Sequence, residues 1–183
     1  MFRILLALAL ILTASGTAHA QKFFTKTGHV SFFSDTQMED IKAYTHQGAV
    51  ILNTQTGDVV FSVLMKGFQF EKALMQEHFN EKYVESDKFP KATFTGKITN
   101  LAAVKFTQNG TYNATVQGDM NLHGVSKNIT TQGKVVVENG KIILKADFPL
   151  TIADYNIQIP AAVRDNIAKV VACNVDVTLL PMP

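Results

Sequence analysis

Between Thr111 and His123 the chain alternates without a break between apolar or small side chains and polar ones. Successive side chains of a β-strand point to opposite faces, so this run predicts a strand with one dry face and one wet face. The dry positions are Tyr112, Ala114, Val116, Gly118, Met120 and Leu122. A helix would place these residues all round its axis, which makes a sheet the structure that this segment favours.

Further segments carry the same pattern. The alternation recurs in residues 92–98, 142–152 and 171–179, and less regular runs cover residues 22–34, 41–53, 58–70 and 125–138. Turn-forming dipeptides such as Asn109-Gly110, His123-Gly124 and Asn139-Gly140 separate them. Eight consecutive strands joined mainly by tight turns predict an all-β, antiparallel meander. Because many of these strands are long, we expect an elongated eight-stranded barrel of the lipocalin-like kind, which removes the exposed sheet edges.

Two segments interrupt the strands. Residues 70–85 carry Phe70, Leu74, Phe79 and Tyr83 among charged and amide side chains, which is typical of a short amphipathic helix. Residues 160–169 begin with Pro160 and predict a second short helix or irregular turn. Both segments are expected to cap one end of the barrel or to lie along its side.

The N-terminus has the features of a secretory signal peptide. Arg3 precedes an apolar run, and Ala18-His19-Ala20 provides a cleavage site, so we expect residues 1–20 to be removed and residues 21–183 to form one domain in the periplasm or outside the cell. Removing the leader takes away Arg3, so the formal net charge of +2 falls by one. A nearly neutral chain with scattered lysines does not fit nucleic-acid binding.

No arrangement of residues predicts catalysis, and we expect neither an enzyme nor a metal site or cofactor. Cys173 lies on the apolar parity of the last strand, where it is expected to pack as a small hydrophobe. Arg164, which is the only Arg outside the leader, could bind an anionic head group or could form a local ion pair. If the protein were an enzyme acting on a lipid, Tyr112, His123 and Asp154 would be the first candidates.

The inward-facing parity mixes bulky and small side chains, and we interpret the small ones as leaving room inside the barrel. An apolar ligand chain gains about 0.8 kcal/mol for each buried methylene group. The alternative is that glycines mark bulges and alanines fit a solid core; parity alone does not separate the two. The candidate ligand-binding residues are Phe61, Val63, Phe94, Ile98, Tyr112, Ala114, Val116, Met120, Leu144, Ala146, Phe148, Val171, Val175 and Arg164.

Two motifs carry a family resemblance. The segment 70–96 has a charged pair, a Leu, a Phe, a Pro and a further Phe in the order Glu71, Lys72, Leu74, Phe79, Pro90 and Phe94, and the segment 118–127 has Gly118, Met120, His123, Gly124 and Lys127. With these motifs the chain resembles the YceI-like family of exported polyisoprenoid-binding proteins over nearly its whole mature length. The resemblance implies a lipocalin-like barrel that holds the tail of an isoprenoid or related amphiphile and performs no covalent chemistry.

The leading hypothesis is therefore an exported soluble protein that binds an amphiphilic lipid for transport, storage or sequestration. Transient membrane contact and a homodimer stay open. A small outer-membrane β-barrel is the alternative, but the absence of Trp and the presence of only four Tyr do not fit its aromatic girdles. A lipid-modifying enzyme and a barrel with a solid interior are the remaining alternatives.

Overall fold

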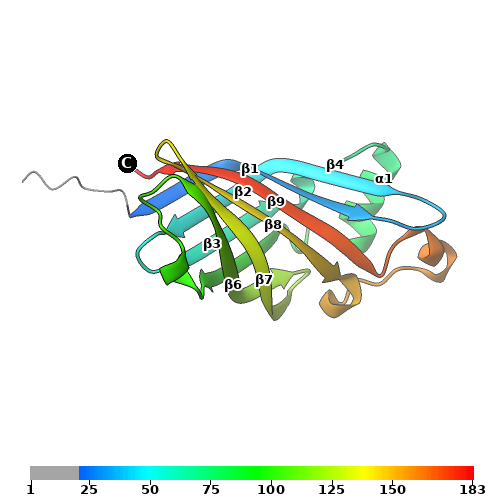
Figure 1. Cartoon of the computed structure of the whole chain (residues 1–183). Coiled ribbons are helices and arrows are strands. Elements are labelled where there is room, and N and C mark those ends of the chain that lie inside the picture. The colour runs from blue at the N-terminus through cyan, green and yellow to red at the C-terminus, as the bar shows by residue number, and fades with distance from the viewer. Residues whose placement is uncertain (1–20) are drawn as a thin grey trace, which may run out of the picture.

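The computed structural model describes residues 21–183, which form an elongated antiparallel β-barrel (Figure 1). The predicted signal peptide lies outside the described residues. The sheet order is β1-β9-β8-β7-β6-β5-β3-β2-β4, and pairing of β1 with β2 closes the barrel. The strands are β1 (Lys22–Ser34), β2 (Ile41–Asn53), β3 (Asp58–Leu64), β4 (Gln69–Phe70), β5 (Lys91–Ile98), β6 (Gly110–Leu122), β7 (Val125–Glu138), β8 (Lys141–Thr151) and β9 (Val170–Pro181).

The predicted fold class is confirmed: the eight long strands follow the alternating segments, and consecutive strands pair antiparallel. The hairpin turns lie where the turn-forming dipeptides predicted them. His123 and Gly124 between β6 and β7 have φ values of 52° and 74°, and Asn139 and Gly140 between β7 and β8 have φ values of 49° and 77°. Two successive left-handed residues match the twist of the flanking strands, which favours tight hairpins at these places.

One strand boundary differs from the prediction. Residues 58–70 were expected to form a single strand, but β3 ends at Leu64 and the 3₁₀ turn η1 (Met65–Gly67) precedes the short β4. The reason is the spacing of Met65 and Phe68, which are both 5% exposed. Side chains three residues apart share a face in a 3₁₀ turn and lie on opposite faces of a strand. Burial of both therefore ends the strand.

The two interrupting segments form short helical pieces, mostly at one end of the barrel. Residues 70–85 contain the helix α1 (Ala73–His78) and a π-type turn η2 (Phe79–Tyr83), where one continuous helix was expected. Residues 160–169 contain the 3₁₀ turn η5 (Ala161–Asn166). Two further 3₁₀ turns are η3 (Leu101–Ala103) and η4 (Ile152–Tyr155). No helix within residues 21–183 has the length and apolar character needed to span a bilayer.

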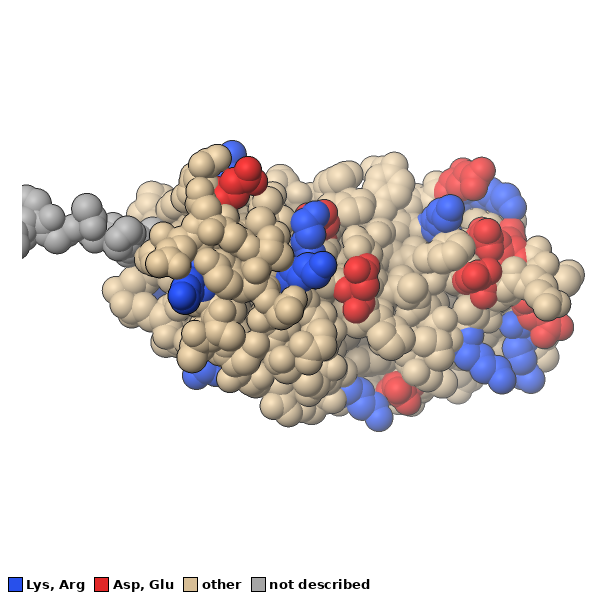
Figure 2. Space-filling model, viewed as in Figure 1, with Lys and Arg blue, Asp and Glu red and all other residues tan. Residues whose placement is uncertain are grey.

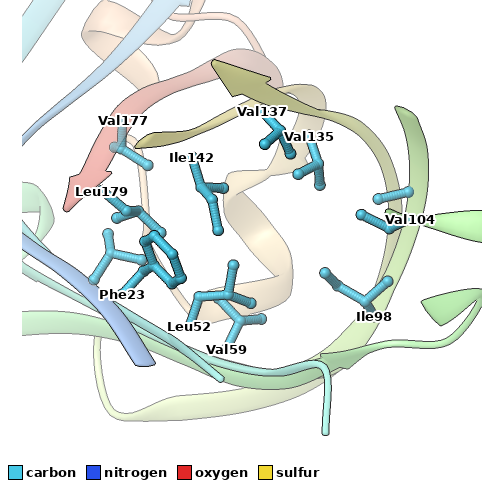
Figure 3. Close-up of a cluster of buried hydrophobic side chains, with 12 residues drawn as sticks. Phe23, Leu52, Val59, Ile98, Val104, Val135, Val137, Ile142, Val177 and Leu179 are labelled. Carbon is cyan, nitrogen blue, oxygen red and sulfur yellow. The ribbon is translucent and has the colours of Figure 1, made fainter. Parts of the chain in front are cut away.

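Buried side chains form two clusters, one toward each end of the barrel. The first lies where β1 begins and β9 ends, and Figure 3 shows Phe23, Leu52, Ile142 and Leu179 pointing toward one another from opposite walls. The second lies at the end that carries α1 and η4, and it contains Met65, Phe68, Phe79, Tyr155 and Ile157 among others. The strands are longer than either cluster, so the middle of the barrel belongs fully to neither.

The wall is incomplete between β7 and β8. Pairing of β6 with β7 runs over the full hairpin, and pairing of β8 with β9 runs from Ile142 to Thr151. Pairing of β7 with β8, in contrast, ends where Gly133 lies opposite Ala146. Figure 1 shows the two strands diverging beyond that point. The remainder of each strand is therefore bonded to a neighbour on one side only.

Candidate functional site

A cavity of about 360 Å³ lies inside the barrel, and residues of both buried clusters contribute to its wall. This volume falls within the range of roughly 300–1,000 Å³ that is typical of small-molecule sites. Apolar side chains form most of the lining, and they come from the strands and from the segments around α1, η4 and η5.

Most of the predicted ligand-binding residues line this cavity. They are Phe61, Val63, Phe94, Ile98, Ala114, Val116, Met120, Leu144, Ala146, Phe148, Val171 and Val175. Tyr112 is placed elsewhere: its ring packs against the first cluster, and its hydroxyl donates to the carbonyl oxygen of Gln108 at 3.0 Å. Arg164 lies in η5 and does not contribute to the lining, although its neighbours Val163 and Asn166 do.

Ala114, Gly133 and Ala146 line the cavity, whereas Gly28, Gly96 and Gly118 do not supply empty space. A Cβ atom on Gly96 would lie 2.5 Å from Cζ of Phe94, and one on Gly118 would lie 2.8 Å from the same atom. A Cβ atom on Gly28 would lie 2.5 Å from Cγ1 of Val177. Neighbouring side chains therefore already occupy the room beside these glycines.

Four phenylalanine rings that the candidate set omitted close the cavity toward α1. Phe32 of β1 packs on Phe68, Phe70 and Phe79, with ring centroids 5.5, 5.9 and 5.6 Å away. All four line the cavity as well. Phe32 follows the inward parity of β1 and could have been found from the sequence. Phe68 lies in an irregular segment, where alternation gives no signal.

Loops at this end are joined by polar contacts, and we call the ring of loops around Glu39, Lys72 and Asn166 the mouth. Glu39 lies between β1 and β2; its carboxylate accepts from Nζ of Lys72 at 2.8 Å and from Nδ2 of Asn166 at 3.4 Å. The hydrogen bond from Lys72, followed by that from Asn166, lowers the pKa of the Glu39 carboxyl, and the same carboxylate raises the pKa of Lys72. Nearby, Oγ of the buried Ser34 accepts from the backbone N–H of Ala168 at 2.8 Å.

Cys173 faces the cavity from β9 and is partly buried. Burial raises the pKa of its thiol to about 12. The thiolate is the reactive form of cysteine, so this environment suppresses nucleophilic and metal-binding chemistry. The expected packing role agrees with this environment.

His123 joins three segments beside the second cluster. Its Nε2 lies 2.7 Å from Oε2 of Glu85, and its Nδ1 lies 3.0 Å from the carbonyl oxygen of Tyr155 in η4. The ring of Phe89 packs edge-on against it at 4.7 Å between centroids. Since both ring nitrogens face oxygen acceptors, the imidazole serves as a clasp between η4 and the β6–β7 turn.

The three residues named as first candidates for catalysis do not converge. Tyr112 lies near the start of β6, whereas His123 lies in the turn after its end. Asp154 lies in η4 next to Tyr155, whose carbonyl His123 contacts, and its side chain is exposed. Within residues 21–183 no three His, Cys, Asp or Glu side chains group closely enough to hold a metal ion. Figure 2 shows acidic and basic side chains dispersed over the visible face of the barrel rather than gathered in one patch.

Comparison with solved structures shows the same fold in three other proteins. A polyisoprenoid-binding domain from Saccharophagus degradans, implicated in plant cell wall breakdown, has 15% identity and a TM-score of 0.76 over 89% of this chain and 99% of that one. BcnA from Burkholderia cenocepacia has 14% identity and a TM-score of 0.68 over 83% and 95% of the two chains. A YceI protein from Campylobacter jejuni has 14% identity and a TM-score of 0.53 over 72% and 78%.

Sequence comparison assigns the family. No curated protein matches the chain in sequence. The profile of the YceI-like domain, in contrast, matches residues 13–179, which includes every long strand and the whole lining of the cavity. The resemblance carried by the two motifs is thereby confirmed, and the chain belongs to the YceI-like domain family.

Proposed function

We propose that this protein binds the apolar tail of an isoprenoid or a similar single-chain amphiphile inside the barrel and carries, stores or sequesters it outside the cytoplasm. The observation that carries the proposal is the apolar cavity of about 360 Å³ inside the barrel. Binding of a hydrocarbon chain against such a lining removes apolar surface from water, which favours binding by roughly 25 cal/mol for each Å² of apolar surface buried.

The family and its neighbours support this ligand class. The domain from Saccharophagus degradans, which shares the fold over nearly its full length, is described as polyisoprenoid-binding. The location outside the cytoplasm rests on the signal-peptide features of residues 1–20. We further propose that binding involves no covalent step, because the thiol at the cavity wall is held in its unreactive form and Tyr112 lies at the other end of β6 from His123.

The orientation of the barrel wall favours a binding protein over an outer-membrane barrel. The inward parity is apolar, as in Leu52, Val135 and Val177, which are almost fully buried. The outward parity carries charged and amide side chains such as Lys97, Gln117 and Lys145. A barrel that spans a membrane has the opposite arrangement, with an apolar band on its outside.

A cavity-filling substitution tests the proposal. Ala146→Phe adds a ring to the cavity wall, whereas Ile143→Phe adds one to the outward face of the same strand. Purified protein is mixed with geranylgeraniol, and bound ligand is counted by native mass spectrometry and by displacement of a dansyl-labelled geranylgeranyl probe. We expect binding to the parent and to Ile143→Phe, and a loss of about tenfold or more in affinity for Ala146→Phe. A folded parent that takes up neither compound would refute the proposed function.

A further inference from the structure

The cavity adjoins three parts of the barrel: the first cluster, the mouth and the wall between β7 and β8. The first cluster fills the end where β9 terminates, with Leu52, Val177 and Leu179 fully buried. The lining reaches Glu39 and Asn166 of the mouth, where the rings of Phe32, Phe68, Phe70 and Phe79 pack together and the contact of Glu39 with Lys72 bridges two loops.

The third part is the wall between β7 and β8, and we call the opening in it the window. Its upper edge is the last paired rung, Gly133 opposite Ala146, where a Cβ atom on Gly133 would lie 2.7 Å from the carbonyl oxygen of Lys145. Its lower edge is the clasp of His123 on the Tyr155 carbonyl, which holds η4 against the β6–β7 turn. Between these edges the two strands are not paired with each other.

The inward side chains along the window are only partly buried. Ile129 and Thr131 on β7 and Ala146 and Phe148 on β8 all line the cavity. Inward residues of the same two strands nearer the first cluster, such as Val135 and Ile142, are 2% and 1% exposed. The outward side chains of Lys134 and Lys145 also line the cavity, so the cavity reaches the outer side of the wall at the window.

The rim of the window suits the polar end of an amphiphile. The backbone N–H and C=O groups that a continued ladder would have paired remain along both strands, and strand edges of this kind bind ligand polar groups or water. Thr130, Gln132 and Asp147 are exposed beside them. Charged side chains on the window strands and beside them include Lys127, Lys134, Lys145, Asp147 and Asp176, of which Lys145 and Asp176 pair at 2.7 Å.

We infer that the window is the portal of the cavity: a single apolar chain passes between β7 and β8 rather than through the bridged mouth, and the polar head of the amphiphile stays at the rim. This inference rests on the proposed function and assigns it a route. It also accounts for the missing rungs, since continued pairing of β7 with β8 would close the wall at this place.

A reversible block at each opening tests the route. In a Cys173→Ala background, Thr131→Cys places a thiol at the window and Met75→Cys places one at the mouth, since both positions line the cavity and are partly exposed. Each variant is reacted with benzyl methanethiosulfonate, and dithiothreitol removes the label afterwards. The association and dissociation rates of a dansyl-labelled geranylgeranyl probe are then measured by stopped-flow fluorescence.

We expect the label at Thr131→Cys to slow both rates by about tenfold or more, with a much smaller change in equilibrium affinity, because an obstruction in a path raises the barrier in both directions. The label at Met75→Cys should change both rates less than about twofold, and dithiothreitol should restore the unlabelled rates.

The opposite result, in which the mouth label slows uptake and the window label does not, would overturn the portal. Faster dissociation with weaker affinity after labelling Thr131→Cys would also count against it, because that is the effect of merely filling the cavity. Absence of probe binding by the unlabelled parent would instead reject the proposed function, and the portal with it.

Discussion

Gly96 and Gly118 lie directly opposite each other on β5 and β6, and the ring of Phe94 covers both. A Cβ atom at Gly96 would approach both Cζ of Phe94 and the carbonyl oxygen of Gln117 to 2.5 Å. The absence of side chains at Gly96 and Gly118 thus leaves room for the ring of Phe94. This ring lines the cavity and packs edge-on against Phe61, with 6.5 Å between the ring centroids.

Gly96→Ala is expected to destabilise the protein. Alanine in a strand is favoured over glycine by roughly 0.5–1 kcal/mol through backbone entropy, but the contact with a backbone oxygen cannot relax easily, and overpacking costs about 1–3 kcal/mol. Urea unfolding of Gly96→Ala, Phe94→Leu and the double variant measures the free energy of unfolding. Because Phe94→Leu removes the ring atom that the new methyl meets, the double variant should lose less than the sum of the single variants. A neutral or stabilising effect of Gly96→Ala would show that Phe94 and the neighbouring strand leave room for a methyl group at this position.

The positions of the strands could be predicted because alternation is a local property of the chain. The role of Gly96 and Gly118 could not be predicted from the sequence, because it depends on contacts with the ring of Phe94 and with the neighbouring strand. The same holds for the window: Val125–Glu138 alternates continuously past Gly133, and nothing in that pattern marks where β8 leaves it. Likewise, the residues of the two clusters and of the cavity wall follow the same alternation, so the pattern does not show where the barrel is filled. Irregular segments add further buried side chains, such as Phe68 and Tyr155, to the second cluster.

Cys173 is expected to react slowly with thiol reagents. With a pKa of about 12, only about one thiol in 10⁴ is ionised at pH 8. The reaction rate with Ellman's reagent should keep rising about tenfold per pH unit from pH 7 to 10 in the folded protein, and should level off near pH 8.5 when the protein is unfolded in urea. A bound isoprenoid should slow the folded protein's reaction further, because the thiol lines the cavity. A plateau near pH 9 in the folded state would contradict the assigned environment.

The mouth is expected to loosen in acid. Hydrogen bonds from Lys72 and Asn166 hold the pKa of Glu39 below its ordinary value of 4.5. A carboxyl with a lowered folded-state pKa stabilises the structure above its unfolded pKa, and this contribution is lost as the pH falls through the folded value. Amide exchange at Ala168, whose N–H donates to Ser34, should therefore become less protected below about pH 4 relative to pH 6.

Glu39→Gln provides the control for this acid response, because Asp35, Asp40 and Glu71 are further carboxyl groups on the same segments. The amide keeps the shape of the side chain but cannot form the ion pair with Lys72. We expect its Ala168 protection to be low at both pH values and nearly independent of pH. If the variant retains the full pH dependence of the parent, another carboxyl is responsible.

The His123 clasp should contribute both to stability and to the lower edge of the window. His123 has a left-handed φ of 52°, and its side chain, 11% exposed, contacts Glu85 and the Tyr155 carbonyl. His123→Ala removes both of these contacts, which costs about 1–3 kcal/mol, and it also places alanine in a left-handed conformation. His123→Asn removes the contact with Glu85 while tolerating that φ, so it should lose less in urea unfolding. Because the clasp holds η4 beside the window, both variants should also release a dansyl-labelled geranylgeranyl probe faster than the parent. Unchanged release alongside lower stability would assign the clasp a purely structural role.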